Sequence, residues 1–301
     1  NMGKFFIIKN YWRNIDKNIL ASFLLLFTLG IFFSFSSTSF LADERLNKGY
    51  YFFFQKHLIY ALFSFSLMIF ISIINTDLIN KSLIPIFLFF LLLLILVPFF
   101  GTEVKGAKRW LNFYIFRFQP VEFIKPFFIL VIAQIITSNW VKNLNFAHFF
   151  SFLILSSLIL LLVLQPDLGQ SVLLICTWLS LVFVSGASIF YLSLILIFVV
   201  SLFFILLFLA PEKFNYIIGR LTSFMDPEKS GYSQSQKATE AIKQGGLKGQ
   251  GMGEGILKES VPEAHTDYII AVVSEEFGSI VSILIITIFL FLAFRIIKKV
   301  I

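Results

Sequence analysis

Residues 147–185 read AHFFSFLILSSLILLLVLQPDLGQSVLLICTWLSLVFVS, and this stretch decides the fold class. It holds two apolar runs, 147–164 and 168–185, joined by little more than Gln165, Pro166 and Asp167. A helix needs about 20 mostly apolar residues to cross a hydrocarbon core of roughly 30 Å. Both runs approach that length, so the stretch predicts two membrane-spanning helices connected by a tight turn.

The same pattern recurs along the whole chain of 301 residues. A transmembrane barrel would instead show short strands of alternating hydrophobicity. We therefore predict an all-α polytopic membrane protein, in which residues 1–301 form a single domain. Its eight expected transmembrane helices are 19–40, 57–74, 83–100, 120–137, 147–164, 168–185, 189–210 and 268–294.

The composition excludes several classes of protein. Hydrophobic residues make up 58% of the chain and charged residues 14%, whereas a soluble domain carries about 25% charge. A water-soluble enzyme and a disordered chain are thereby excluded. The single cysteine, Cys176, lies in an apolar run, so no intrachain disulfide or cysteine-ligated metal site can form. The chain has no long basic run that would indicate nucleic-acid binding.

Two connections between the apolar runs stand out, 101–119 and 211–267. The second is rich in Gly, Lys and Glu, and Ser233–Lys243 within it predicts a short amphipathic helix that ends at Gly245 and Gly246. A long ordered loop in a tight bundle is usually functional. We expect 211–267 to be a large extracytoplasmic loop.

Lysine and arginine near the spans predict the orientation. Both ends of the chain are basic, and eight spans place them on the same side, which we take to be the cytoplasm. Connection 101–119 then lies outside, although its four cations outnumber its one carboxylate. Either it is a statistical exception or its cations face an anionic, lipid-linked ligand. The residues concerned are Lys4, Lys9, Arg13, Lys17, Arg295, Lys298 and Lys299 at the ends, and Lys105, Lys108, Arg109, Arg117 and Glu103 in the connection.

A first group of candidate site residues lies at the start of the predicted span 120–137. Pro120 suits the first turn of a helix, and Gln119 and Glu122 could cap it. Lys125 lies one turn deeper, where an ammonium group needs a partner. Glu122 is three residues back on the same face, so a local ion pair is one possibility.

The other two groups contain acidic residues. Asp167 lies between two spans and either caps the second helix or serves a site on the same outer side. Asp267 lies where the long loop meets the last span. Glu275 and Glu276 lie about two turns deeper, where carboxylates are functional candidates by default. One of these two glutamates is a possible partner for Lys125.

Four long motifs in order resemble the signatures of the SEDS (shape, elongation, division and sporulation) family of membrane proteins. The motifs are GAKRWLNFYIFRFQPVEFIK, QPDLGQSVLL, SGYSQSQKATEAIKQGGLKGQGMGEG and VPEAHTDYIIAVVSEEFG, and they span about residues 101–280. The GEG, PEAHTDYI and EEFG positions favour the division branch over the elongation branch. The family has ten spans, so the resemblance also implies that the last two lie beyond this sequence.

The resemblance implies a peptidoglycan glycosyltransferase that polymerises lipid II outside the cytoplasmic membrane and releases undecaprenyl pyrophosphate. Its expected partners are a class B penicillin-binding protein, a transpeptidase of the FtsI type, and other division proteins at the septum. The essential acidic residue of the family corresponds to Asp267. It would act as a general base or as a ligand of a divalent cation, Mg²⁺ or Mn²⁺.

Further residues match the family signatures or suit a phosphate. The guanidinium of Arg109 matches phosphate geometry and is our first choice for the pyrophosphate, ahead of Lys108 and Lys105. We expect Trp110 to line the outer cavity. The remaining candidates for substrate binding are Gln119, Glu122, Lys125, Asp167 and His265. Four glycines either let the long loop fold over the site or simply form turns: Gly245, Gly246, Gly249 and Gly251.

Three other functions compete with septal polymerisation. An elongation polymerase would share the chemistry. A lipid II flippase needs polar groups at the middle of the bilayer, where only Lys125, Glu275 and Glu276 are clear candidates. A scaffold that recruits a transpeptidase would require neither Asp267 nor the basic connection.

Overall fold

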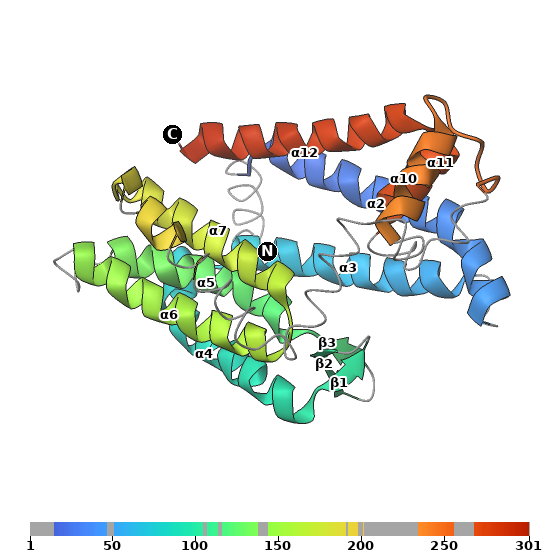
Figure 1. The fold of residues 1–301 in the computed structure, drawn as a ribbon. Coiled ribbons are helices and arrows are strands. Elements are labelled where there is room, and N and C mark those ends of the chain that lie inside the picture. Colours follow the sequence, from blue (N-terminus) through green and yellow to red (C-terminus); the bar gives the residue numbers. More distant parts are fainter. Residues whose placement is uncertain are drawn as a thin grey trace, which may run out of the picture. The chain divides into compact units, whose positions relative to one another are not determined.

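The computed structural model describes residues 15–46, 51–104, 107–113, 116–137, 144–190, 192–197, 201, 234–255 and 268–300. The chain divides into two compact units. One unit contains residues 75–221, and the other contains residues 1–74 together with 222–301. Figure 1 shows the described helices and strands of both units.

Within the described residues, the main elements of the unit 75–221 are four packed helices and a small sheet. Its helices are α4 (Thr76–Phe100), α5 (Pro120–Thr137), α6 (Leu144–Leu164) and α7 (Leu168–Val184). Helix α5 contacts the other three helices. Lipid is as apolar as leucine, so packing and hydrogen bonds hold such helices together. The fully buried side chains include Leu94, Ile124, Phe128, Leu158 and Trp178, and Trp178 Nε1 donates to Ser151 Oγ at 2.9 Å.

Pro98 and Gln165 form a compensating pair within this unit. A proline inside a helix cannot donate to the carbonyl four residues earlier, and Pro98 therefore leaves Leu94 O without its usual helical donor. Gln165 Nε2 donates to Leu94 O at 3.1 Å, and its side chain is buried. The turn between α6 and α7 is thereby attached to α4.

We expect Gln165→Leu to destabilise the protein by about 1–3 kcal/mol, because a buried carbonyl loses its donor. In a Pro98→Ala background the new backbone N–H can serve Leu94 O, and Gln165→Leu should then cost clearly less. Thermal unfolding of the four proteins in one detergent measures the difference. An equal cost of Gln165→Leu in both backgrounds would contradict this pairing.

The second unit contains the remaining helices. They are α2 (Lys17–Leu46), α3 (Phe52–Ile73), α10 (Gln234–Gly245), α11 (Ile269–Phe277) and α12 (Ser279–Val300). Asp16 caps α2 through the N–H groups of Asn18 and Ile19 and lies 3.3 Å from Arg295 Nη2. The Ile19 N–H is the main cause that lowers the pKa of Asp16, and Arg295 adds to it. The start of α2 and the end of α12 therefore meet, as expected for two basic ends on one side of the membrane.

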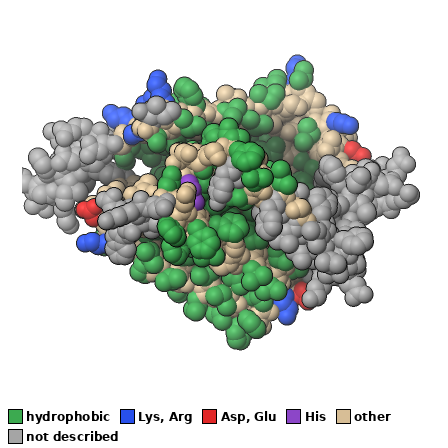
Figure 2. Space-filling model, turned by 60° about the vertical axis from the view of Figure 1, so that its left-hand side comes forward, with side chains coloured by type: hydrophobic (Ala, Val, Ile, Leu, Met, Phe, Trp, Pro, Cys, Tyr) green, Lys and Arg blue, Asp and Glu red, His purple; other side chains and the backbone are tan. Residues whose placement is uncertain are grey.

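Six of the described helices are long and apolar enough to span a membrane. They correspond to the predicted runs at 19–40, 57–74, 83–100, 120–137, 147–164 and, in its second part, 268–294. Helix α7 matches the run 168–185 but has only 17 residues. Most of the run 189–210 lies outside the described residues, so the predicted total of eight stays a prediction. Many exposed side chains on these helices are large and apolar, as a lipid environment requires, and Figure 2 shows them over much of one face.

Two predictions about local structure were wrong. The run 268–294 is not one helix, because Gly278 (φ 85°) separates α11 from α12. Connection 101–119 is not plain loop within an all-α fold. It forms an antiparallel sheet of β1 (Thr102–Val104), β2 (Ala107–Phe113) and β3 (Phe116–Phe118), in the order β1-β2-β3. Alternation of aromatic or branched residues with polar ones, which favours strands, was the overlooked signal.

The predicted amphipathic helix in the long loop is confirmed. It is α10, and Gly245 is its last residue. Its buried Ala238 and Ala241 pack on Ala271 of α11, with Tyr268 alongside. Small side chains let two helices approach closely, so α10 is closely packed on α11 within this unit.

Candidate active site

The alternation of strand β2 decides which cation of the basic connection points inward. Successive side chains of a strand face opposite sides, and Ala107 and Leu111 are both buried. Arg109 lies between them on the same inner face, and its side chain is 22% exposed. Lys108 belongs to the other face, where it is exposed and lies opposite Glu103 of β1.

Arg109 contacts the turn between α6 and α7. Its Nε donates to Gln165 O at 3.4 Å and lies 3.7 Å from Asp167 Oδ2. Its Nη2 donates to Pro166 O. The basic connection 101–119 and the turn that contains Asp167 therefore meet in space. Any phosphate that binds Arg109 must share or replace these contacts.

Asp167 is buried and precedes α7 directly. The predicted alternative was that its carboxylate caps this helix. No such side-chain cap forms within the described part of the chain. The backbone oxygen of Asp167 accepts from Ser171 N at 3.2 Å and from Ser171 Oγ at 2.9 Å, while its carboxylate faces Arg109. Its environment favours an ionic role over a capping role.

Glu122, Lys125 and Gln170 form a closed hydrogen-bonded group. Lys125 Nζ donates to Glu122 Oε2 at 2.6 Å and to Gln170 Oε1 at 3.0 Å. Gln170 Nε2 donates to Glu122 Oε1 at 2.7 Å. The local ion pair predicted from the three-residue spacing is confirmed. Sequence reasoning missed Gln170, although it lies in the QPDLGQSVLL motif, one turn after Asp167.

The closed group predicts a charge-swap result. Lys125→Glu places two carboxylates together and should destabilise the protein by about 1 kcal/mol, a modest cost because the Glu122 side chain is 45% exposed and solvent screens the repulsion. The double variant Glu122→Lys, Lys125→Glu restores the pair, and the amide of Gln170 can rotate to serve it. We expect the double variant to recover most of the lost thermal stability in detergent. A double variant as unstable as the single one would refute the group as a stabilising unit.

Two other predicted residues have defined places near the sheet. Trp110 of β2 is half-buried, and its backbone oxygen accepts from Thr102 Oγ1 at 3.2 Å. Gln119 directly precedes α5, and its backbone oxygen accepts from Glu122 N at 3.2 Å. Because Glu122 instead binds Lys125 and Gln170, the expected cap between Gln119 and Glu122 is a backbone contact. Roles for Trp110 and Gln119 in substrate binding stay predictions.

Three predicted site residues lie outside the described residues: Lys105, His265 and Asp267. The two acidic residues that follow them in the chain are described. Glu275 and Glu276 are both buried, with exposed fractions of 0% and 1%. Ser36 Oγ donates to Glu276 Oε2 at 3.3 Å. A pair between Lys125 and either glutamate would join the two units, and it stays a prediction.

The expected divalent cation also stays a prediction. The described ranges contain no group of three or more His, Cys, Asp or Glu side chains that could hold a metal ion. The ligand expected from the resemblance, Asp267, lies outside them. Magnesium binds through one or two carboxylates together with phosphate oxygens of a substrate, so one aspartate and a pyrophosphate form a chemically suitable set.

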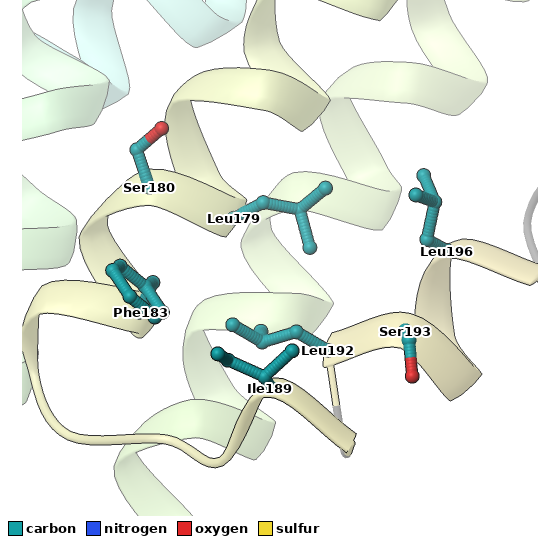
Figure 3. Close-up of a pocket in the computed structure, with 7 residues that line it drawn as sticks. All are labelled: Leu179, Ser180, Phe183, Ile189, Leu192, Ser193 and Leu196. Carbon is teal, nitrogen blue, oxygen red and sulfur yellow. The ribbon is translucent and has the colours of Figure 1, made fainter.

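A pocket of about 350 Å³ lies between α7 and the helical residues that follow it. Figure 3 shows Leu179 and Phe183 of α7 near Ile189 and Leu192. Its walls are apolar apart from two serines, Ser180 and Ser193. It contains none of the predicted site residues and no charged side chain among its lining residues.

Comparison with known proteins now identifies the family. A family model described as cell cycle protein, covering FtsW, RodA and SpoVE, matches residues 16–301. This chain belongs to the FtsW/RodA/SpoVE family. The SEDS resemblance drawn from the four motifs is therefore confirmed.

Curated relatives within the FtsW/RodA/SpoVE family carry a common name. Three of them are named "probable peptidoglycan glycosyltransferase FtsW". The Haemophilus influenzae protein matches at 34% identity, over 97% of this chain and 77% of the relative. The Haemophilus ducreyi protein matches at 36% identity, over 94% and 72%. The Caulobacter vibrioides protein matches at 31% identity, over 95% and 72%.

Solved structures show that the fold is that of the FtsW/RodA/SpoVE family. One is described as the structural coordination of polymerization and crosslinking by a peptidoglycan synthase complex. It matches with a TM-score of 0.70 and 20% identity, over 94% of this chain and 77% of that chain. The rod shape determining protein RodA of Thermus thermophilus matches with a TM-score of 0.56 and 19% identity, over 91% and 72%.

Proposed function

We propose that this protein is a peptidoglycan glycosyltransferase that polymerises lipid II at the outer face of the cytoplasmic membrane. The observation that carries the proposal is the match to curated FtsW proteins named as such enzymes, over more than nine-tenths of this chain. The FtsW name and the GEG, PEAHTDYI and EEFG positions favour septal synthesis during division. An elongation role is the second candidate, supported by the fold of RodA.

The chemistry requires few groups from the protein. The C4 hydroxyl of the GlcNAc in lipid II attacks the anomeric carbon of the growing strand. A new C–O bond forms there, the bond to the pyrophosphate oxygen breaks, and undecaprenyl pyrophosphate leaves with the electron pair. We assign the hydroxyl proton to Asp267, because one carboxylate base suffices when the leaving group is already good. General base catalysis contributes roughly 10²–10⁴-fold.

Cations near the leaving group supply the second contribution. Charge that develops on the pyrophosphate is stabilised by fixed positive groups. Arg109 is held in the turn that contains Asp167, while Lys108 of the same strand is exposed to solvent. We therefore assign initial attraction of the pyrophosphate to Lys108 and its final orientation to Arg109. Asp267 is the residue that would hold a divalent cation, which would supply Lewis-acid stabilisation of the leaving group.

The partner in this proposal is a class B penicillin-binding protein with transpeptidase activity. A structural relative described as coordinating polymerization and crosslinking supports such a pairing. The N-terminus is assigned to the cytoplasm, because both ends of the chain are basic and the start of α2 meets the end of α12.

The decisive experiment gives the full-length protein and its transpeptidase partner labelled lipid II and Mg²⁺ or Mn²⁺, and resolves the products by size. We expect long glycan strands when the transpeptidase is inactivated by a β-lactam. Liposomes that report movement of labelled lipid II between leaflets test the flippase. Movement without strands would favour a transporter, and an intact complex with neither result would favour a scaffold.

A further inference from the structure

The helix interrupted at the end of the fourth motif carries an inference beyond the proposed activity. Helix α11 ends at Phe277, Gly278 follows with φ 85°, and α12 begins at Ser279. The last carbonyl groups of one helix and the first N–H groups of the next have no partner within their own helices. In apolar surroundings each unsatisfied group costs several kcal/mol. Such a break needs partners from another segment.

The segment 245–255, which we call the glycine segment, supplies those partners. Gln250 N donates to Glu275 O at 2.9 Å, and Gly251 N donates to Glu276 O at 3.0 Å. In return, Gly246 O accepts from Ser279 N at 2.9 Å and from Ser279 Oγ at 2.7 Å. The glycine segment and the junction of α11 and α12 thus satisfy each other's backbone hydrogen-bonding groups.

Three glycines make this contact sterically possible. A Cβ atom on Gly245 would overlap Ser274 O, and one on Gly249 would overlap Glu276 O. A Cβ atom on Gly278 would overlap Leu247 O. In each case the obstacle is backbone, which cannot rotate away as a side chain can. The two backbones approach this closely only because all three positions are glycine.

Other glycines of the same segment have a different environment. Gly253 has φ 84°, almost the same as the 80° of Gly249, yet a Cβ atom there would meet nothing within 4 Å. At Gly253 the positive φ favours glycine, but no steric overlap does. At Gly249 the same backbone conformation is combined with direct contact on α11. The two positions form a matched pair for experiment.

We infer that docking of the glycine segment on the junction of α11 and α12 positions the catalytic carboxylate of the proposed polymerase. Asp267 directly precedes Tyr268, which is the N-cap of α11. Because Asp267 is bonded to the residue that begins α11, a shift of α11 is expected to be transmitted to Asp267 through the chain. Gly245, Gly249 and Gly278 are positioning residues, and the inference rests on the proposed function.

The test compares Gly249→Ala with Gly253→Ala in the complex with the transpeptidase partner. Misplacement by about 1 Å can cost up to 10²-fold in rate, so we expect kcat of Gly249→Ala to fall about 10–100-fold. Gly253→Ala carries the same backbone strain without the overlap, and should stay within about threefold of wild type. The value of KM should change little in either variant.

A pH profile distinguishes misplacement from loss of folded protein. A smaller folded fraction scales the whole kcat profile and leaves its shape unchanged. A displaced base changes the apparent pKa of the acidic limb, and we expect such a change for Gly249→Ala alone. If Gly249→Ala fails to fold, Ser279→Ala removes only the hydroxyl bond to Gly246 O. Ser279→Ala should then show a smaller fall in kcat than expected for Gly249→Ala, with the same change in the pH dependence of kcat.

Equal losses in Gly249→Ala and Gly253→Ala would overturn the inference, and so would full activity of Gly249→Ala. In both cases wild type still makes strands, so the proposed function survives. A soluble, partner-bound Ser279→Ala protein with unchanged kcat and profile would count against the inference in the same way. Wild type that makes no strands would instead remove the proposed function, and the inference with it.

Discussion

Asp267→Asn is expected to lower lipid II polymerisation by roughly 10²–10⁴-fold, the range of general base catalysis. The amide has nearly the shape of the carboxylate, but it cannot accept the hydroxyl proton and carries no charge for a cation. Folding and binding of the transpeptidase partner should be unaffected. Size-resolved glycan products from labelled lipid II measure the effect directly.

A matched control for this substitution is Asp77→Asn. Asp77 is an exposed aspartate in the first turn of α4 and belongs to none of the site groups. Exposed substitutions of this kind usually change stability by less than about 0.5 kcal/mol, so its activity should match wild type. If Asp267→Asn still makes long strands, the protein remains a polymerase but Asp267 is not its base. His265 and Asp167 are then the next candidates for the base.

Arg109→Ala is expected to reduce polymerisation by about 10²–10³-fold, comparable to the loss of a donor that stabilises a developing negative charge. The structure adds a second expected effect, on stability. The substitution removes donors to Gln165 O and Pro166 O, and it leaves the buried carboxylate of Asp167 without this guanidinium. Thermal unfolding in detergent and kinetics on lipid II should both be measured.

The double variant Arg109→Ala, Asp167→Asn separates the two effects. Neutralising Asp167 removes the buried charge, so stability should return toward wild type. If Arg109 stabilises the leaving pyrophosphate, polymerisation by this stable double variant stays well below that of Asp167→Asn alone, which is the reference because Asp167 is itself a candidate site residue. Recovery of activity together with stability would instead show that Arg109 acts only by holding the turn in place.

The sequence predicted the membrane helices well because long apolar runs follow from one requirement, the thickness of the bilayer. It also predicted the pair of Glu122 and Lys125, since residues three apart on a helix are neighbours. Both predictions depend on local spacing alone. The start of α5 at Pro120 has the same origin.

The features that were missed depend on contacts between distant segments. The break at Gly278 follows the polar residues Ser274, Glu275 and Glu276, but the partners that satisfy its backbone groups come from the glycine segment, which lies about 30 residues earlier in the chain. Gln170 appeared as one polar residue near a helix start until its partners on α5 were known. The inward direction of Arg109 required the strand that sequence reasoning treated as loop. Spacing along the chain could not supply these partners.

The bond from Gln165 to Leu94 O also has a consequence for the order in which the protein matures. The two residues are separated by 71 positions. Chains are synthesised from the N-terminus at about 5–20 residues per second, so α4 exists for several seconds before the side chain that completes it. During that interval Leu94 O lacks this donor and relies on water or on a local adjustment of the helix. The proline in α4 thus leaves one carbonyl group of this helix to a turn that the ribosome has yet to make.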